Sequence, residues 1–344
     1  MGTVNLTEKD TEMEILRTAE IEDEKHITSL ESSVSKSGFL PVFRSGSSSV
    51  IGERRTMEDE HICVDSLENY DLCESNGDYK VSGRLSAFYG VFDGHNGSDA
   101  SHFIRENILT LILQDENLHR SVPKAIVSAY VKADHLFSDA ESVDSESGTT
   151  ALTALFFGRN LYVANAGDCR AVMSRLGKAM ELSTDHRPDE PSEKIRIEKL
   201  GGSVDTDGYL DGQLAVARAI GDWHMKGSDF DSPLTPVPEL REVVLTEEDE
   251  FLILACDGLW DVMTSQCAVS MVRRELRKSN DPTCCSRELV NEALRRRSGD
   301  NVTVVTICFS PFPPSIPEIT LYRPRKLFFS QLSSVKKKKN NNKN

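Results

Sequence analysis

The stretch from Leu85 to Gly97 reads LSAFYGVFDGHNG, an apolar run of eight residues that ends directly in Asp93. Runs this apolar predict strands that are buried on at least one face. Two further acids border apolar runs in the same way: Asp257 directly after residues 251–256, and Asp300 shortly before residues 302–309. Acids held rigidly at buried strand ends repel one another unless a cation lies between them. The pattern therefore predicts a site for a hard metal ion, built on a sheet.

The composition is that of a soluble globular protein, with 344 residues, of which 38% are hydrophobic and 28% charged. This length suffices for a substantial core in one large domain or two small ones. The formal charge of −15 argues against nucleic acid or an anionic membrane as the main partner of the folded body. No stretch approaches the length of a membrane span, so no membrane association is expected. A phosphorylated substrate would need local cations at its site.

The eight cysteines show no C-x-x-C pair and no zinc-ligand spacing. Several of them lie in apolar runs, where a free thiol behaves as a small hydrophobic side chain. The N-terminus is polar and acidic and lacks the apolar core of a signal peptide. These features predict reduced thiols and a cytoplasmic or nuclear protein.

Composition divides the chain into three parts. Residues 1–40 are rich in Glu, Asp, Ser and Lys, and we expect them to form a mobile leader. The prolines of residues 311–317 cannot continue a strand or a helix, so they mark the end of a folded domain over residues 41–311. Residues 312–344 form a tail that closes on Lys336–Lys339 and a run of asparagines. The tail reads either as a solvated segment or as a nuclear-import patch.

Helices and strands alternate in blocks within the middle part. Amphipathic spacing predicts helices over residues 98–113, 123–137, 192–200, 265–278 and 286–297. Residues 150–157, 161–166 and 169–174 read as a meander of three strands joined by tight turns. Consecutive strands joined in this way favour antiparallel pairing, which predicts an α+β fold with helices layered on sheets.

Seven motifs stand out along the chain: RRTMED (54–59), VFDGHNG (91–97), SGTTA (147–151), ANAGDCR (164–170), ARAIGD (217–222), DGLWD (257–261) and DN (300–301). They occur in the order seen in the metal-dependent protein phosphatases of family 2C. The chain resembles this family from about Val50 to Phe309, and it is most similar to the plant members.

The resemblance implies a fold and a reaction. The fold is an α-β-β-α sandwich, in which two antiparallel sheets pack face to face between outer layers of helices. The site lies in a cleft at one end of the sandwich, with residues 185–212 as a flap beside it. The reaction is hydrolysis of phosphoserine and phosphothreonine in phosphorylated protein substrates by a metal-activated water, without a covalent intermediate. We expect a monomer.

The resemblance also implies a set of metal ligands. In the family the acid matching Asp93 bridges two Mg²⁺ or Mn²⁺ ions, and the glycine matching Gly94 lends its carbonyl to one of them. The acids matching Asp257 and Asp300 complete the shell of the other ion. The remaining implied contacts are Glu58, direct or through water and with Asp59 behind it, and Asp168 and Asp261 at a third, weaker metal site.

Two further residues carry implied roles in the reaction. Arg54 matches the arginine that grips the substrate phosphate, and a guanidinium fork suits two phosphoryl oxygens. His95 matches the candidate general acid, which would protonate the leaving alkoxide. From position alone, His95 is equally well a structural cap on the turn after Asp93. Asp222 and Arg218 are expected to be structural.

Other classes of protein remain as alternatives. A phosphatase with a cysteine nucleophile would use a C-x5-R loop, and this spacing occurs at Cys169–Arg175 and at Cys267–Arg273. Neither interval contains the glycine that a phosphate-binding loop needs, and one reads as a strand and the other as a helix. A binding protein that had lost catalysis would lack metal carboxylates, which are present here. A nucleic-acid or membrane-surface protein would act through the lysines of the tail.

Overall fold

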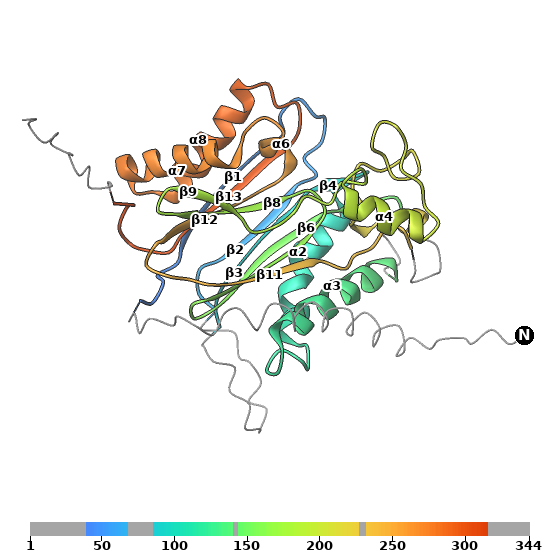
Figure 1. Cartoon of the computed structure of the whole chain (residues 1–344), viewed down its shortest axis with the longest axis horizontal. Helices are drawn as coiled ribbons and strands as arrows, with labels where there is room; N and C mark the ends of the chain where they lie inside the picture. Colours follow the sequence, from blue (N-terminus) through green and yellow to red (C-terminus); the bar gives the residue numbers. More distant parts are fainter. Residues whose placement is uncertain (1–38, 68–84, 140–143, 227–231, 316–344) are drawn as a thin grey trace, which may run out of the picture. The chain divides into compact units, whose positions relative to one another are not determined.

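The computed structural model of the protein describes residues 39–67, 85–139, 144–226 and 232–315 (Figure 1). All but the last two residues of the predicted leader, and the tail beyond residue 315, lie outside these ranges. Up to Pro314 the described residues belong to one compact unit.

Within these described ranges the β structure consists of two antiparallel sheets of five strands and one small sheet of three strands. In the first sheet the order is β1 (Arg44–Val50), β13 (Val302–Cys308), β12 (Asp249–Ala255), β8 (Arg170–Arg175) and β9 (Lys178–Glu181). In the second it is β11 (Glu239–Val244), β7 (Asn160–Ala166), β6 (Ala151–Phe157), β3 (Leu85–Phe92) and β2 (Glu60–Val64). The small sheet has the order β10 (Ile220–Gly221), β5 (Gly148–Thr149) and β4 (Gly94–His95).

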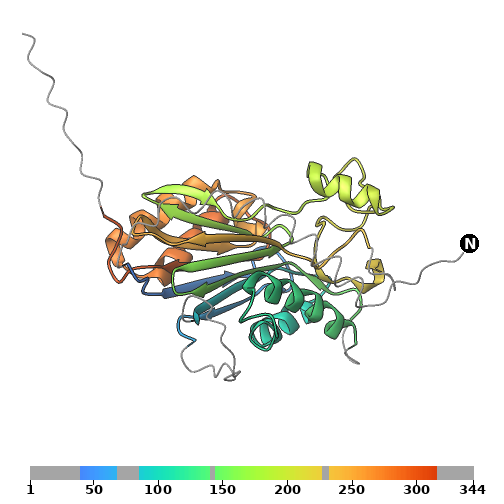
Figure 2. The same ribbon diagram turned by 60° about the horizontal axis from the view of Figure 1, so that its bottom comes forward.

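Helices cover the outer faces of both large sheets, as Figure 2 shows. The second sheet packs against α2 (Asp99–Leu113) and α3 (Val122–Ser138). The first packs against α6 (Asp257–Trp260), α7 (Ser265–Ser279) and α8 (Pro282–Arg295). Two short helices, α4 (Pro191–Lys199) and α5 (Trp223–Lys226), lie in the segment between β9 and β11. The predicted α+β sandwich is confirmed.

Strand β3 explains why the chain needs such apolar runs. Tyr89 and Val91 point into the core between the two sheets, whereas Phe88 and Phe92 pack against the helices of the outer layer. Because successive side chains of a strand point to opposite faces, a strand covered on both sides must be apolar at every position. The end of such a strand is fixed by packing on both faces.

The predicted three-strand meander is wrong at its third strand. Strands β6 and β7 form a hairpin in the second sheet, but β8 pairs with β12 and β9 in the first. The free edge of β7 is taken by β11, so β8 has no place beside it. Residues 167–169 instead carry the chain from one sheet to the other, and Gly167 makes this bend with φ of +115°. The crossing places the buried Asp168 between the two layers.

Candidate active site

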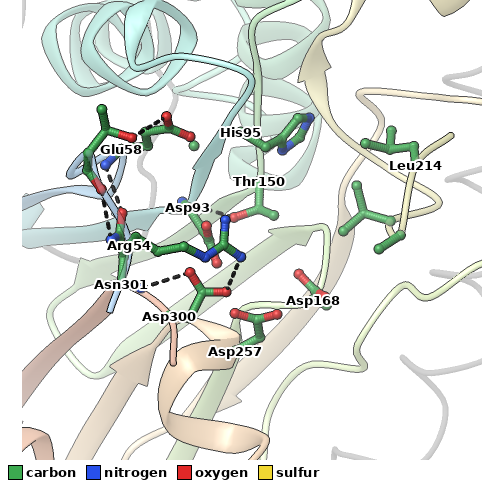
Figure 3. A pocket seen from close by; sticks show the side chains of 14 residues that line it. Arg54, Glu58, Asp93, His95, Thr150, Asp168, Leu214, Asp257, Asp300 and Asn301 are labelled. Carbon is green, nitrogen blue, oxygen red and sulfur yellow. Dashed lines mark hydrogen bonds and ion pairs between the residues drawn. The ribbon is translucent and has the colours of Figure 1, made fainter. Parts of the chain in front are cut away.

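Four aspartates from different strand ends line one cavity of about 160 Å³ (Figure 3). Asp93 follows β3 in the second sheet, and Asp168 lies in the crossing from β7 to β8. Asp257 follows β12 and Asp300 precedes β13. Because β12 and β13 are antiparallel neighbours, the end of one and the start of the other meet at the same edge of the first sheet.

Three of these carboxylates are close enough to share a cation. Oxygens of Asp93, Asp168 and Asp257 all lie within 4.8 Å of one another. Burial raises the pKa of Asp93 and of Asp168 well above the ordinary value, and neighbouring carboxylates add to both shifts. Burial likewise raises the pKa of Asp257 to about 6. A divalent cation would relieve this repulsion, and a set of carboxylate oxygens suits Mg²⁺ or Mn²⁺.

Asp59 faces the same acids, although the sequence pointed to Glu58. Asp59, Asp93 and the Cys256 thiol form a second group of potential ligands within 4.8 Å of one another. Burial raises the pKa of Asp59 to about 6, and its Oδ1 has no hydrogen-bond partner among the described residues. An orphaned buried oxygen of this kind is what an ion would satisfy.

The Glu58 carboxylate belongs to neither ligand group, although Glu58 lines the cavity. Its Oε1 accepts a hydrogen bond of 2.8 Å from the Thr56 hydroxyl. Its backbone N–H donates to Asn301 Oδ1 at 2.8 Å, and its carbonyl accepts from the Ser101 hydroxyl at 2.6 Å. In this structure Glu58 therefore contributes its backbone to the frame of the site.

Arg54 and Asp300 form an ion pair at the mouth of the cavity. Arg54 Nη2 lies 2.8 Å from Asp300 Oδ2, and 59% of the arginine side chain is exposed. The other oxygen of Asp300 accepts the backbone N–H of Asn301 at 2.7 Å. The exposed guanidinium thus lies beside the acids that line the cavity (Figure 3).

Gly94 is required by close packing. A Cβ at this position would overlap the carbonyl oxygen of Glu58. Asn96, two residues on, has φ of +55°, which asparagine tolerates better than most residues. The turn after Asp93 therefore depends on both residue types.

His95 hydrogen-bonds a buried carboxylate. Its Nε2 lies 2.8 and 3.0 Å from the two oxygens of Asp222, which is fully buried. Since a carboxylate only accepts, Asp222 holds a proton on Nε2 of the imidazole. Among the described residues, the His95 ring therefore bonds Asp222 and not the turn after Asp93, where position alone allowed it to act as a structural cap. A Cβ at Gly148 would overlap both side chains, so this contact also requires a glycine.

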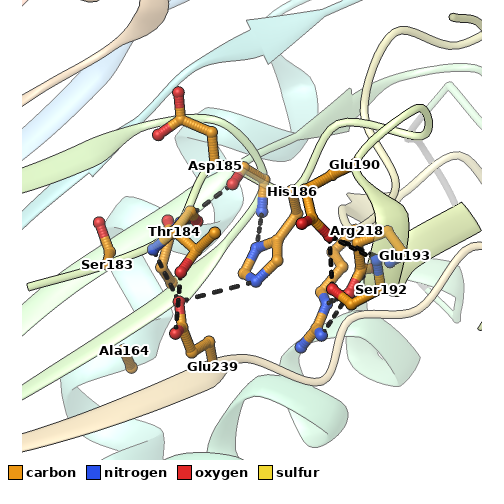
Figure 4. A network of polar contacts seen from close by, with 12 residues as sticks. Ala164, Ser183, Thr184, Asp185, His186, Glu190, Ser192, Glu193, Arg218 and Glu239 are labelled. Atoms are coloured by element: carbon orange, nitrogen blue, oxygen red, sulfur yellow. Dashed lines mark hydrogen bonds and ion pairs between the residues drawn. The ribbon is translucent and has the colours of Figure 1, made fainter.

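The turn that carries Asp168 is held by His186, which the sequence did not single out. The backbone N–H of Gly167 donates to His186 Nδ1 at 3.3 Å, and the backbone N–H of His186 returns a bond to the Gly167 carbonyl at 3.0 Å. The side-chain amide of Asn165 donates to the Gly167 and Thr184 carbonyls. Thr184 is in turn bound by the Glu239 carboxylate (Figure 4). The crossing between the sheets is therefore fixed by the start of the flap segment.

The state of His186 predicts a pH dependence of stability. Burial, with Arg218 and Arg196 acting in the same direction and Glu193 opposing them, lowers the pKa of His186 to about 3. The unfolded chain binds this proton near pH 6.5, so the stability from neutral His186 is present above that pH and is lost as the pH falls toward 3. Relative to a His186→Asn variant, the metal-free protein should lose about 1.4 kcal/mol of unfolding free energy per pH unit below about 6. Urea titrations from pH 7 to 5 measure this, and parallel curves would contradict it.

Asp261 lies apart from the grouped acids. More than half of its side chain is exposed, and Arg187 Nη2 lies 2.6 Å from its Oδ1. The same guanidinium approaches Asp168 Oδ2 with its Nε at 3.7 Å. A cationic side chain therefore contacts both acids that were predicted to form a third metal site. That role of Asp261 stays a prediction.

The wall opposite the acids comes from a segment just beyond the predicted flap. Leu214, Ala215 and Val216 line the cavity, whereas the prediction ended the flap at residue 212. The segment has its own small core, in which Leu210 and Leu214 pack against Ile197 of α4. An apolar wall therefore faces the acids across the cavity.

Neither C-x5-R segment forms a phosphate-binding loop. The first runs along β8 and the second lies within α7. Burial raises the pKa of the Cys169 thiol well above its ordinary value, and the thiol lies 3.1 Å from the Thr150 hydroxyl. A cysteine nucleophile needs an accessible thiolate, so the geometry contradicts this alternative.

Comparisons with known proteins agree with one another. The family model described as protein phosphatase 2C matches residues 43–302. A probable protein phosphatase 2C 27 of Arabidopsis thaliana is 59% identical over 287 residues, which cover 83% of this chain and 74% of that protein. A probable protein phosphatase 2C 57 of Oryza sativa subsp. japonica is 53% identical over 292 residues, covering 83% and 77%. The crystal structure of a serine-threonine phosphatase 2C from Toxoplasma gondii has a TM-score of 0.64 and 26% identity, covering 79% of this chain and 96% of that one.

Proposed function

This chain belongs to the protein phosphatase 2C family, with plant relatives, and is a metal-dependent serine/threonine protein phosphatase; from this premise we propose how its residues divide the work. Two ions of Mg²⁺ or Mn²⁺ would be held by Asp93, which both would share, together with Gly94, Asp257, Asp300 and, directly or through water, Glu58. Asp168 and Asp261 would hold a third ion more weakly.

The observation that carries this proposal is the group of three carboxylates, Asp93, Asp168 and Asp257, within 4.8 Å of one another, of which Asp168 is buried and the other two are half-buried. So much negative charge in one buried place is costly unless cations offset it. Asp59, with its orphaned oxygen, adds a further acceptor to this group. Divalent ions, when bound, offset the charge of a phosphate monoester and supply a nucleophilic water at neutral pH.

The protein's own side chains then act on the substrate. Arg54 leaves Asp300 and binds two phosphoryl oxygens with its guanidinium fork. His95, whose Nε2–H is held by Asp222, acts as an imidazolium and gives its Nδ1 proton to the serine or threonine oxygen as it leaves. Leu214, Ala215 and Val216 line the opposite wall with apolar side chains, which offer no polar group that could bind the phosphate in place of Arg54. No side chain forms a bond to phosphorus.

The substrates are phosphoproteins, and we propose that the chain acts as a monomer in the cytoplasm or nucleus without binding nucleic acid through its folded domain. The formal charge of −15 supports the last point. In the described ranges, none of the helices has both the length and the apolarity that a bilayer crossing requires.

Chelation separates this function from its rivals. Phosphatase activity of the purified protein toward a phosphothreonine peptide should vanish in EDTA and return on addition of excess Mn²⁺ or Mg²⁺, because the buried carboxylates need cations to bind a dianion. Alkylation with iodoacetamide should leave the activity unchanged, since Cys169 and Cys256 are buried and protonated. Activity that survives EDTA but is lost on alkylation would point to a cysteine nucleophile.

A further inference from the structure

A buried ion pair lies behind the small sheet that carries His95. Lys226 Nζ lies 2.6 Å from Asp134 Oδ1, and both side chains are at least 96% buried, with exposures of 4% and 3%. Asp134 belongs to α3, whereas Lys226 ends α5. From the contacts below we infer that this pair positions Asp222, and through it His95, for proton transfer to the leaving group. The inference rests on the proposed role of His95.

The pair binds the strand that leads into Asp222. The same Oδ1 of Asp134 accepts the backbone N–H of Gly221 at 2.8 Å. Lys226 Nζ donates to the carbonyl of Ala219 at 2.8 Å. Residues 219–221 are therefore held by one donor, the Lys226 ammonium, and one acceptor, the Asp134 carboxylate. These two groups carry opposite charges and bind each other.

The turn at Gly221 and Asp222 needs this support. Both residues have positive φ, +88° for Gly221 and +52° for Asp222. The left-handed conformation is unfavourable for a residue with a side chain and persists only where the surroundings impose it. The backbone N–H of Asp222 donates to the Ser147 carbonyl at 3.0 Å, which fixes the turn from the opposite side.

The small sheet transmits this position to His95. Gly221 pairs with Gly148 in β5, and Gly148 pairs with His95 in β4. The Asp222 carboxylate and the imidazole meet over Gly148, where no Cβ would fit. A shift of Asp222 therefore changes the 2.8 Å contact with His95 Nε2.

An ion pair is a costly way to fill buried space. Removing two charges from water offsets much of their attraction, and apolar replacements of similar volume are often neutral or stabilising. The pair instead fixes the orientation of residues 219–221, because a charged pair with fixed hydrogen bonds has one arrangement, while packed methyl groups allow several. Trp223 adds a further contact to α3 by donating its Nε1–H to the backbone carbonyl of Asp134 at 3.1 Å.

The test is to replace the pair by apolar residues, Asp134→Leu together with Lys226→Met. The metal-loaded variant should keep turnover of p-nitrophenyl phosphate within about twofold and lose about tenfold or more on a phosphothreonine peptide, because only the poor leaving group needs a proton donor. The single Asp134→Asn variant keeps the volume and the acceptor for Gly221, so it should fold and show a smaller loss with the same dependence on the leaving group.

A second ion pair, largely but less completely buried, with exposures of 13% and 9%, serves as the control. Arg273 of α7 lies 2.7 Å from Glu250 of β12, at the far end of that strand from Asp257. Replacing it by Met and Leu should change the two substrates equally. Equal losses on both substrates for the Asp134 and Lys226 variants, or no loss, would overturn the positioning role while leaving the metal-dependent function intact. A His95→Gln enzyme without any leaving-group dependence would overturn the proton donation itself.

Discussion

An Asp93→Asn variant is expected to lose at least about a thousandfold in turnover, because each divalent ion supplies several kcal/mol of charge stabilisation in the transition state. In the absence of metal, this variant is expected to unfold at a higher temperature than the unmodified protein, also without metal. Loss of activity with a gain in stability is an unusual combination, and it follows from the position of one carboxylate.

The stability gain has an electrostatic cause. Burial raises the pKa of Asp93 well above its ordinary value, and Asp59, Asp257 and Asp168 raise it further. The charged form is therefore disfavoured in the metal-free protein, and asparagine removes the charge while keeping nearly the same shape. The backbone contacts with Thr150 remain.

Thermal unfolding with and without Mn²⁺ separates the two effects. A ligand that binds only the folded state raises its stability by an amount set by concentration and affinity. Mn²⁺ should thus raise the melting temperature of the unmodified protein well above that of its EDTA-treated form, and the variant should gain much less. A variant that retained near-normal turnover at saturating Mn²⁺ would refute the bridging role of Asp93.

The second large effect is expected for His95→Gln. Loss of a positioned proton donor should slow hydrolysis of a phosphoserine peptide by about a hundredfold or more, since general acid catalysis contributes on this scale. An aryl phosphate, whose leaving group needs no proton, should be hydrolysed at a rate within a few fold of normal. Steady-state kinetics on both substrates at saturating Mn²⁺ measure the difference.

Asp222→Asn provides the control for this result. The amide keeps the volume but no longer holds a proton on Nε2 in the way a carboxylate does. It should therefore reproduce part of the loss on the phosphoserine peptide and little on the aryl ester. Equal slowing of the two substrates by His95→Gln would argue that the imidazole is a structural element of the turn.

The sequence revealed the acids because of their neighbours. Each of Asp93, Asp257 and Asp300 borders an apolar strand, and apolar strands covered on both faces form the middle of this fold. The layered architecture and the convergence of these ends could therefore be predicted from local pattern together with the family resemblance.

The parts that the sequence did not reveal depend on pairing between distant segments. Nothing local shows that β8 leaves the sheet of β7, because the competing partner of that edge, β11, lies far along the chain. Asp222 read as structural, since its contact with His95 is made across Gly148. His186 gave no signal beyond its place near the flap, although its ring accepts the bond that fixes the turn before Asp168.

The acids that gather at one end come from both layers of the sandwich, while Phe43, Phe156 and Phe309 interlock the layers at the other. A cation bound among the aspartates would thus hold the two sheets together at this end, where their carboxylates repel each other without it. The stability of the packing between the sheets and the affinity for the ion are therefore coupled, and the coupling is reciprocal. A substitution that disturbs the packing of the two sheets, even far from the site, will therefore lower the affinity for the ion. The ion, in turn, stabilises that packing by the same coupling free energy.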